Sequence, residues 1–197
     1  MTQTLMDPPT LLPESIAVPR KRWTRTEYRQ LMQTGFLEDG KYELVLGEIW
    51  KKMGQGRLHI IVVMRIIKAL EMVFGFARLQ SQSSLPVGED GEPEPDLAVL
   101  AQNLDHYREM APTPAEVLLV VEASDSTLRP DLTAKARQYA SAGISDYWVV
   151  NIQARTVHVF RQPTETGYGS EMVFADHEEV RPLAAPDAAV RVADLLP

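Results

Sequence analysis

The chain has 197 residues, of which 45% are hydrophobic and 24% are charged, so it is suited to one globular domain and is not a wholly disordered chain. Its 20 basic and 27 acidic residues give a net charge of −7, which disfavours a protein that coats nucleic acid non-specifically, although a nuclease can gather its basic side chains on one face. Because the chain has no cysteine, disulfides, thiolate nucleophiles and cysteine-type zinc sites are excluded.

The N-terminal segment predicts an extended arm. Four prolines lie within residues 1–20, and prolines at this density favour a chain without helix or strand. We therefore expect a flexible arm over residues 1–22 and a single domain over residues 23–197. The segment lacks the basic-then-apolar order of a signal peptide, and the most apolar stretch, residues 58–74, carries three charges. We expect a cytoplasmic protein with no membrane span.

Residues 24–52 predict a short helix followed by a hairpin. Thr24 is a suitable N-cap for a helix that ends near Thr34, and Glu27 three residues later completes a capping box. Residues 41–52 alternate apolar and polar side chains around Gly47, which predicts two short strands joined by a tight turn. A helix and a hairpin are thus expected before the most apolar stretch of the chain.

Residues 57–74 show the spacing of apolar side chains that is typical of a helix. The apolar arc is wide, so we expect this helix to be covered on more than one side, with Met64 and Met72 in the core. The same wide arc suggests a homodimer.

The rest of the chain predicts strands around one further helix. Pro130 and Gly143 frame a helix over residues 130–142. Residues 116–124 form a nearly continuous apolar run, which is typical of a central strand buried on both faces. Further strands are expected over residues 77–87, 95–100, 146–152 and 155–161. This order predicts an α/β fold with a mixed central sheet flanked by helices.

Two carboxylates lie near the ends of predicted strands. Asp96 begins one strand directly after Pro95, and Glu122 lies near the end of another. If these strands are neighbours, both carboxylates converge at one edge of the sheet and can hold a divalent cation, which would offset the cost of burying them. The alternative from the residues alone is that Asp96 caps a turn and Glu122 pairs with an arginine.

Three segments in this order carry a family resemblance: PDLAVL at 95–100, LLVVEASDSTLRPDLTAK at 118–135 and YASAGISDYWVV at 139–150. The sequence resembles the Uma-two family of endonucleases within the PD-(D/E)XK restriction-endonuclease-like superfamily, from Tyr42 to about Phe160. The resemblance implies a restriction-endonuclease-like core and metal-dependent cleavage of phosphodiester bonds.

The resemblance also implies three site residues. Asp96 matches the aspartate motif and Glu122 the second acidic position, so these two are the expected metal ligands. The superfamily lysine would fall at Ser124, where this chain has none, and in the family it is displaced onto the next helix, where Lys135 fits. The structural alternative for Lys135 is a surface pair with Asp131, four residues earlier.

Two more residues match family positions near the start of the fold. Glu43 corresponds to a family glutamate, and His59 to a histidine that begins the first core helix. The family usually has an acidic residue where this chain has Leu46. The alternatives are that Glu43 faces solvent on an edge strand and that His59 is a buried, hydrogen-bonded histidine.

Basic side chains supply candidate contacts to DNA. Arg129 and Arg137 flank Lys135 and are candidates for phosphate contacts, whereas the basic cluster in residues 19–25 is more simply a solvated charge run. The short polar side chains of residues 124–127 either line the site or, more simply, cap the following helix.

The residues and the resemblance together predict a DNA endonuclease that depends on Mg²⁺ or Mn²⁺. Phosphodiester hydrolysis needs a cation that activates water and an ammonium that orients it, and Asp96, Glu122 and Lys135 supply these groups. Two alternatives stay open. Carboxylates that point apart would favour a catalytically degenerate binding or scaffold protein, and a closed narrow pocket would favour a phosphoesterase of small substrates.

Overall fold

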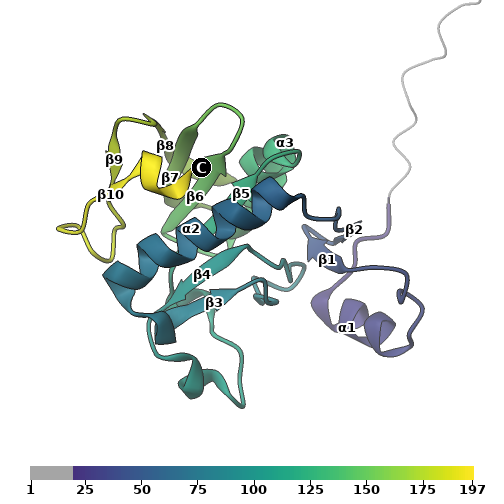
Figure 1. Cartoon of the computed structure of the whole chain (residues 1–197). Coiled ribbons are helices and arrows are strands. Elements are labelled where there is room, and N and C mark those ends of the chain that lie inside the picture. Colours follow the sequence, from purple (N-terminus) through teal and green to yellow (C-terminus); the bar gives the residue numbers. More distant parts are fainter. Residues whose placement is uncertain (1–19) are drawn as a thin grey trace, which may run out of the picture.

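The computed structural model describes residues 20–197, and it is built around a six-stranded sheet (Figure 1). The predicted arm over residues 1–22 lies almost wholly outside the described residues. Along the sheet the strands follow the order β3-β4-β5-β6-β7-β8. Their bounds are Leu79–Ser81 (β3), Leu97–Leu100 (β4), Val117–Ser124 (β5), Asp146–Asn151 (β6), Thr156–Thr164 (β7) and Gly167–Ala175 (β8).

The sheet is mixed because one of its pairs is parallel. β5 and β6 run parallel, and every other neighbouring pair in this sheet is antiparallel. A parallel pair needs a crossover, and here a helical segment over residues 128–141 supplies it. The segment consists of α3 (Leu128–Pro130), a π-helical turn (Asp131–Lys135) and α4 (Ala136–Ser141).

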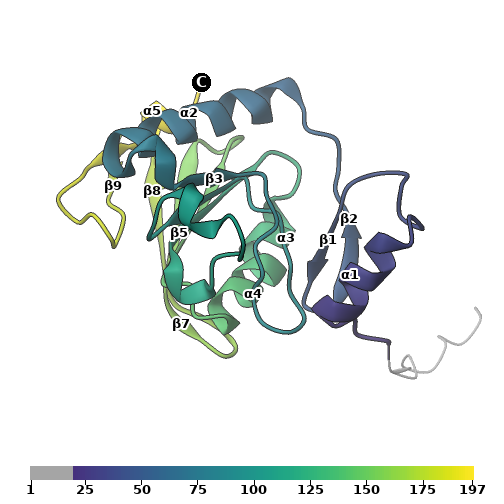
Figure 2. The ribbon, with the colours of Figure 1, turned by 90° about the horizontal axis from the view of Figure 1, so that it is seen from below.

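The two faces of the sheet carry separate apolar cores. Helix α2 (Arg57–Phe74) covers one face and α4 the other, so the sheet lies between them (Figure 2). Successive side chains of a strand point to opposite faces. On β5, Val121 therefore joins the core under α2, whereas Val120 joins the core under α4.

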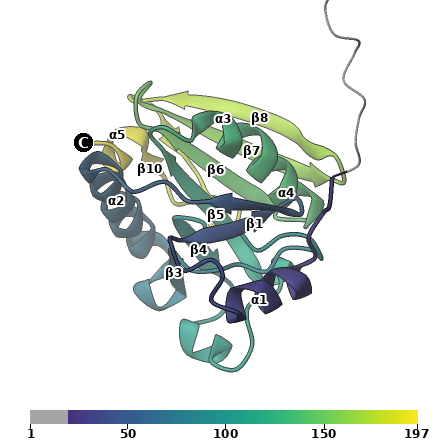
Figure 3. The same ribbon diagram turned by 90° about the vertical axis from the view of Figure 1, so that its right-hand side faces the viewer.

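A small N-terminal lobe stands beside the sheet. It contains α1 (Arg25–Gln33) and the hairpin of β1 (Tyr42–Val45) and β2 (Glu48–Lys51), as Figure 3 shows. Thr24 and Glu27 form the predicted capping box at the start of α1. The hairpin turns at Leu46 and Gly47, whose φ values of 48° and 72° are both positive, as a tight two-residue hairpin turn requires.

Several short elements connect or extend the sheet. Three 3₁₀ turns lie at Phe76–Arg78, Leu104–Tyr107 and Pro114–Glu116. After β8 the chain forms a two-stranded sheet of β9 (Glu179–Val180) and β10 (Val190–Arg191) and ends in α5 (Val192–Leu195), which packs beside α2. No helix or strand was predicted after residue 161, so β8, β9, β10 and α5 were not expected from the sequence.

Three predicted details are wrong. The strand expected over residues 77–87 is reduced to β3, because Gln82 has a φ of 50° and leaves the ladder. The second helical segment begins at Leu128 rather than at Pro130. Met64 and Met72, expected in the core, are 60% and 84% exposed, because the apolar arc of α2 is wider than the surface that covers it. Trp148 is buried.

Among the helices of residues 20–197, none is long and apolar enough to cross a membrane. This agrees with the charges that interrupt the apolar stretch of α2.

Candidate active site

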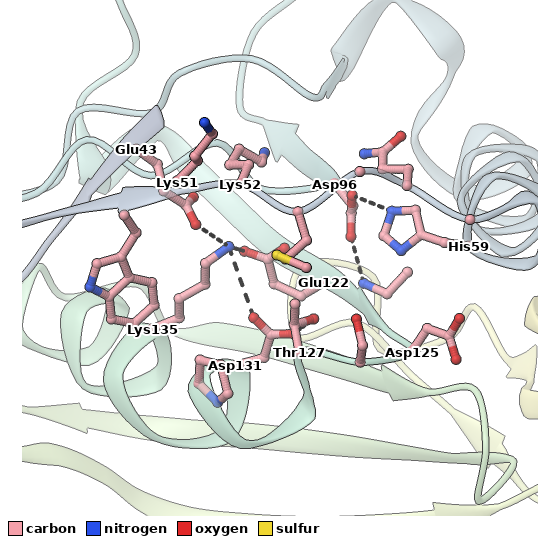
Figure 4. Close-up of a pocket in the computed structure, with 18 residues that line it drawn as sticks. Glu43, Lys51, Lys52, His59, Asp96, Glu122, Asp125, Thr127, Asp131 and Lys135 are labelled. Atoms are coloured by element: carbon pink, nitrogen blue, oxygen red, sulfur yellow. Dashed lines mark hydrogen bonds and ion pairs between the residues drawn. The ribbon is translucent and has the colours of Figure 1, made fainter. Parts of the chain in front are cut away.

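The candidate site is a cavity of about 430 Å³ where the N-terminal lobe meets the sheet (Figure 4). The β1–β2 hairpin, the start of α2, the adjoining ends of β4 and β5 and the π-helical turn all contribute to its walls. All five residues that the sequence analysis named as site residues line it: Glu43, His59, Asp96, Glu122 and Lys135.

Sheet register places Asp96 opposite Glu122. Leu97 pairs with Val121 across β4 and β5, so the residues one step outside that pair, Asp96 and Glu122, face each other and point to the same side of the sheet. The backbone N–H of Ala123 donates to Asp96 Oδ2 at 2.8 Å, which fixes the Asp96 carboxylate at this edge. The two carboxylates therefore converge.

Lys135 reaches the same place from the crossover segment. Its Nζ lies 2.9 Å from Glu122 Oε1, 3.3 Å from Glu43 Oε1 and 3.9 Å from Asp131 Oδ1. The side chain is buried, so Lys135 is not a solvent-exposed partner of Asp131 alone. Val120 lies in the core under α4, and side chains two residues apart on a strand point to the same face, which explains why a lysine from the helix can meet Glu122.

The π-helical turn carries both Asp131 and Lys135 into the site. Such turns occur mostly as single-turn insertions and often at functional sites. Here the turn ends at Lys135, and the next turn of helix supplies Tyr139, whose hydroxyl donates to Glu122 Oε1 at 3.0 Å. The Tyr147 hydroxyl of β6 donates to the carbonyl of Asp131 at 2.9 Å. Sequence reasoning gave no role to Tyr139 or Tyr147.

Asp131 is buried beside the site and is held by the polar segment that precedes it. The hydroxyls of Ser124 and Thr127 both donate to Asp131 Oδ2 at 2.6 Å. These two residues thus bind a buried carboxylate, in addition to lying where the strand passes into the helix. Burial raises the pKa of Asp131, against the lowering by Lys135.

His59 contacts Asp96 from the first turn of α2. Its Nε2 lies 3.0 Å from Asp96 Oδ1, and its side chain is 14% exposed. This hydrogen bond raises the pKa of His59 more than burial lowers it. His59 therefore has features of both expected roles, the site residue and the buried histidine. The imidazole is largely buried and hydrogen-bonded, and it also lines the cavity.

Glu43 does not face solvent. It is buried, it accepts a hydrogen bond from the backbone N–H of Glu94 at 3.1 Å, and it lies within ion-pair distance of Lys135. The hairpin that carries Glu43 is tied to the crossover segment by Gln138, whose Oε1 accepts from the N–H of Leu46 at 2.6 Å. Leu46 thus contributes its backbone N–H to this contact.

Acidic groups outnumber basic groups in the site. Burial raises the pKa of Glu122 to about 8, although Lys135 opposes that rise. Burial lowers the pKa of Lys135, but Glu122, Glu43 and Asp131 together raise it above its usual range, so the ammonium stays charged. Four carboxyls thus surround one ammonium and one imidazole, and a further cation would relieve their repulsion.

Comparison with known proteins identifies the family. A family model described as "Uma2: Putative restriction endonuclease" matches residues 25–193. The chain belongs to the Uma2 family. A crystal structure of "a putative nuclease belonging to DUF820" from Anabaena variabilis has a similar fold, with a TM-score of 0.62 and 16% identity over 80% of this chain and 90% of that one. No curated protein matches the sequence significantly.

These matches confirm the predicted family and the α/β fold with a mixed central sheet. Family and fold indicate a nuclease. The 16% identity to the Anabaena variabilis protein supports the fold and carries no residue roles.

The carboxylates of this Uma2 site are suited to a hard divalent cation that keeps most of its coordinated water molecules. Within residues 20–197, no group of three or more His, Asp or Glu side chains is placed to hold a metal ion together. Mg²⁺ is commonly held by one or two carboxylates, with waters and substrate phosphates completing its shell. The carboxylates of Asp96 and Glu122, which both line the cavity, fit that requirement.

Basic residues in three parts of the Uma2 chain make different contacts. In the basic cluster near α1, Arg22 donates to the carbonyl of Leu46 at 2.6 Å and Arg25 donates to the carbonyl of Gly88 at 2.7 Å. The cluster therefore holds the N-terminal lobe in place and is not only a solvated charge run. Arg129 and Arg137 are exposed on the crossover segment. Two lysines that the sequence analysis did not single out, Lys51 and Lys52, line the cavity.

Proposed function

We propose that this Uma2 protein is a DNA endonuclease that depends on Mg²⁺ or Mn²⁺. The observation that carries the proposal is the approach of Lys135 Nζ to within 2.9 Å of Glu122, on the strand that faces Asp96. Two carboxylates and one ammonium at a sheet edge are the groups that phosphodiester hydrolysis needs, and here the ammonium comes from the helix rather than from the strand.

Each residue of the site has a proposed role. Asp96 and Glu122 hold the cation with the carbonyl of Ala123, and when bound the cation supplies charge neutralisation and a lowered pKa for water. The Lys135 ammonium orients the attacking water and stabilises negative charge on the phosphoryl oxygens. Glu43 positions Lys135 through their ion pair, and His59 positions Asp96 through its hydrogen bond.

Basic side chains around the cavity are suited to the phosphates of DNA. Lys51 and Lys52 line one wall, and Arg129 and Arg137 lie on the crossover segment beside Lys135. Contacts of this kind fix the position of the duplex without reading its sequence. They also reconcile an acidic chain with a polyanionic substrate, because the basic groups are local.

Cleavage of supercoiled plasmid with MgCl₂ or MnCl₂ tests the proposal. The parent protein should nick or linearise the plasmid, and Asp96→Asn should lower the rate by about 10³-fold, the scale expected when one electrostatic contact to the transition state is lost. Asp105→Asn, at a fully exposed carboxylate outside the cavity, is the matched control and should cut at the parent rate. Equal cutting by the Asp96→Asn and parent preparations would mean that the activity comes from a contaminant or another site.

The two alternative functions give different results in the same assay. A catalytically degenerate protein would shift the mobility of plasmid fragments and never cut them with either metal. A phosphoesterase of small substrates would hydrolyse bis(p-nitrophenyl) phosphate in an Asp96-dependent way and leave plasmid intact. Either pattern would replace the endonuclease proposal.

A further inference from the structure

Trp50 places an indole ring on the wall of the candidate site. Glu43 and Trp50 lie directly opposite each other across β1 and β2, so their side chains point to the same face of the hairpin. Glu43 reaches to 3.3 Å from Lys135 (Figure 4), and Trp50 likewise lines the cavity. The indole N–H is directed at Glu48 Oε2, 3.5 Å away on the same strand, so the ring offers apolar surface to the cavity.

Two further side chains extend the apolar part of the lining. Met53, three residues after Trp50, is 74% exposed and lines the cavity, and Pro130 lines it from the crossover segment. Gly54 and Gly56 also belong to the lining, and a Cβ at either position would meet nothing within 4 Å. A flat aromatic ring, an adaptable thioether and open space beside them are suited to a planar ligand such as a nucleobase.

The charged groups that would act on a phosphate are almost completely buried. Asp96, Glu122 and Lys135 are 3–6% exposed, so a phosphate must enter the cavity to meet them. The cavity of about 430 Å³ has the size of a small-molecule pocket, which a single nucleotide can fill. A nucleotide within a duplex is stacked and paired, and it enters such a pocket only when it leaves the stack, at a cost that is least for a base already unpaired.

We propose that the cavity binds one unpaired nucleotide, whose base stacks on Trp50 while its phosphate lies beside Lys135. Glu43 pairs with Trp50 across the hairpin and contacts Lys135, so one nucleotide can span the two. The substrate class, which rests on the proposed nuclease function, is then DNA that is unpaired at the point of cleavage: single strands, flaps and loops. Duplex next to that point stays outside, against Arg129 and Arg137.

Stacking on one indole predicts weak dependence on sequence. Every base has an aromatic face, so a base–indole contact tolerates all four bases, whereas recognition of a base edge requires matched hydrogen bonds. Supercoiled plasmid remains a substrate, because negative supercoiling favours the opening of base pairs. Relaxed, covalently closed plasmid of the same sequence should be nicked at least tenfold more slowly.

Binding in EDTA tests the base site without any cutting. Fluorescence anisotropy compares an oligothymidylate of about 16 nucleotides with an abasic strand of the same length. Trp50→Leu should weaken binding of the oligothymidylate about tenfold or more, the scale of one base–aromatic stack, and leave binding of the abasic strand unchanged. Trp50→Phe should recover part of the affinity. Phe36→Ala, at an aromatic residue of the same lobe that is 79% exposed and outside the lining, is the matched control.

Equal weakening of both strands by Trp50→Leu would mean that Trp50 supports the lobe and not a base, and would overturn the proposal. A parent that binds the abasic strand as tightly as the oligothymidylate would overturn it as well.

Cleavage of one labelled strand in MgCl₂ tests the substrate class. The strand is supplied alone, as a flap on a duplex, and fully paired, and the first two forms should be cut at least tenfold faster than the third. Cutting of the fully paired form at the same rate would overturn the proposal and leave the nuclease function standing. If no form is cut, the nuclease function fails, and the binding measurements still decide whether Trp50 stacks on a base.

Discussion

The two helical segments that cover the sheet bury different chemistry. On α2 the buried positions are Val62, Val63, Ile66 and Leu70, and the helix is regular over 18 residues. The crossover segment over residues 128–141 buries Asp131, Lys135 and Gln138 and contains a π-helical turn. One helix stabilises the sheet through apolar contact, and the other brings charged and polar groups to one edge of it.

The difference shows how a site can be built without weakening the whole fold. Charges that leave water need partners, and each buried polar group of the crossover segment has one: Lys135 has Glu122 and Glu43, and Asp131 has Ser124 and Thr127. The apolar core under α2 needs no such polar partners. The buried charges of the site therefore lie on the α4 face of the sheet, and substitutions on the two faces should differ in their effect on activity and in their dependence on pH.

The largest losses of stability are expected for one substitution on α2 and one on the crossover segment. The two losses should differ in how they depend on pH. Lys135→Ala leaves buried carboxylates without their cation and should lower the free energy of unfolding by about 3–5 kcal/mol at pH 8. Leu70→Ala opens a cavity under α2 and should cost about 2–5 kcal/mol. Urea unfolding at pH 8 and pH 5.5 should show a smaller loss for Lys135→Ala at the lower pH and an unchanged loss for Leu70→Ala. Equal pH responses would contradict the comparison.

Cleavage rates should respond to Lys135 almost as strongly. Lys135→Ala should lower the turnover of plasmid by about 10²–10³-fold, since it removes a contact to the transition state, and should weaken DNA binding much less. In that background Ser124→Lys should restore part of the rate, because residues 122 and 124 point to the same face of β5. Leu70→Ala, assayed below its melting temperature, should cut at the parent rate.

In EDTA, the stability of the protein should depend on pH through the titratable groups on the side of the sheet that the crossover segment covers. The pKa of Glu122 is raised by burial from 4.5 to about 8, so the folded state binds this proton more tightly than the unfolded state. The contribution is therefore fully present below pH 4.5 and is lost as the pH rises toward 8. The raised pKa values of Asp131 and His59 act in the same direction.

Melting temperatures measured from pH 5 to pH 8.5 test this sign. The parent protein should become less stable as the pH rises, and Glu122→Gln should flatten the slope because an amide does not titrate. Mg²⁺ binds the ionised carboxylates, so it should raise the melting temperature more at pH 8 than at pH 5.5. A parent whose stability rises steadily across this range would show that Glu122 is ionised throughout.

The sequence predicted those parts of the molecule whose signals are local. The capping residue Thr24, the turn at Gly47 and the apolar period of α2 each depend on neighbours along the chain, and their elements begin and end close to where they were expected. Leu85 and Val87 were assigned to a strand because they are apolar. They are indeed buried, but in an irregular segment, since burial alone does not require a hydrogen-bonded ladder.

The candidate site was predictable as a set of residues and not as a geometry. Asp96, Glu122 and Lys135 were selected by motif and resemblance, but their approach depends on strand register and on the π-helical turn, which no residue pattern indicates. Asp131, Tyr139 and Gln138 received no functional role because their contacts are between segments far apart in the sequence. β8 was missed because none of its side chains is fully buried and they give no clear alternation.

The smallest of these effects concerns Gln138, which joins the crossover segment to the N-terminal lobe. Its Oε1 accepts from the N–H of Leu46 and its Nε2 donates to the carbonyl of Val87 at 3.2 Å, so one buried side chain holds the hairpin that carries Glu43. Gln138→Leu keeps the volume and leaves two backbone groups unpaired, which should lower the free energy of unfolding by about 1–3 kcal/mol.

Hydrogen exchange can tell this local effect from general loosening. In Gln138→Leu the amides of β1 and β2 should exchange faster, while those of β5 and β6 keep their protection, because the lost hydrogen bonds go to Leu46 and Val87 and not to those strands. Ser141→Ala, which removes a hydrogen bond only within its own helix, is the matched control and should leave the hairpin protected. Faster exchange throughout the sheet would show that Gln138 supports the core under α4 rather than the position of Glu43.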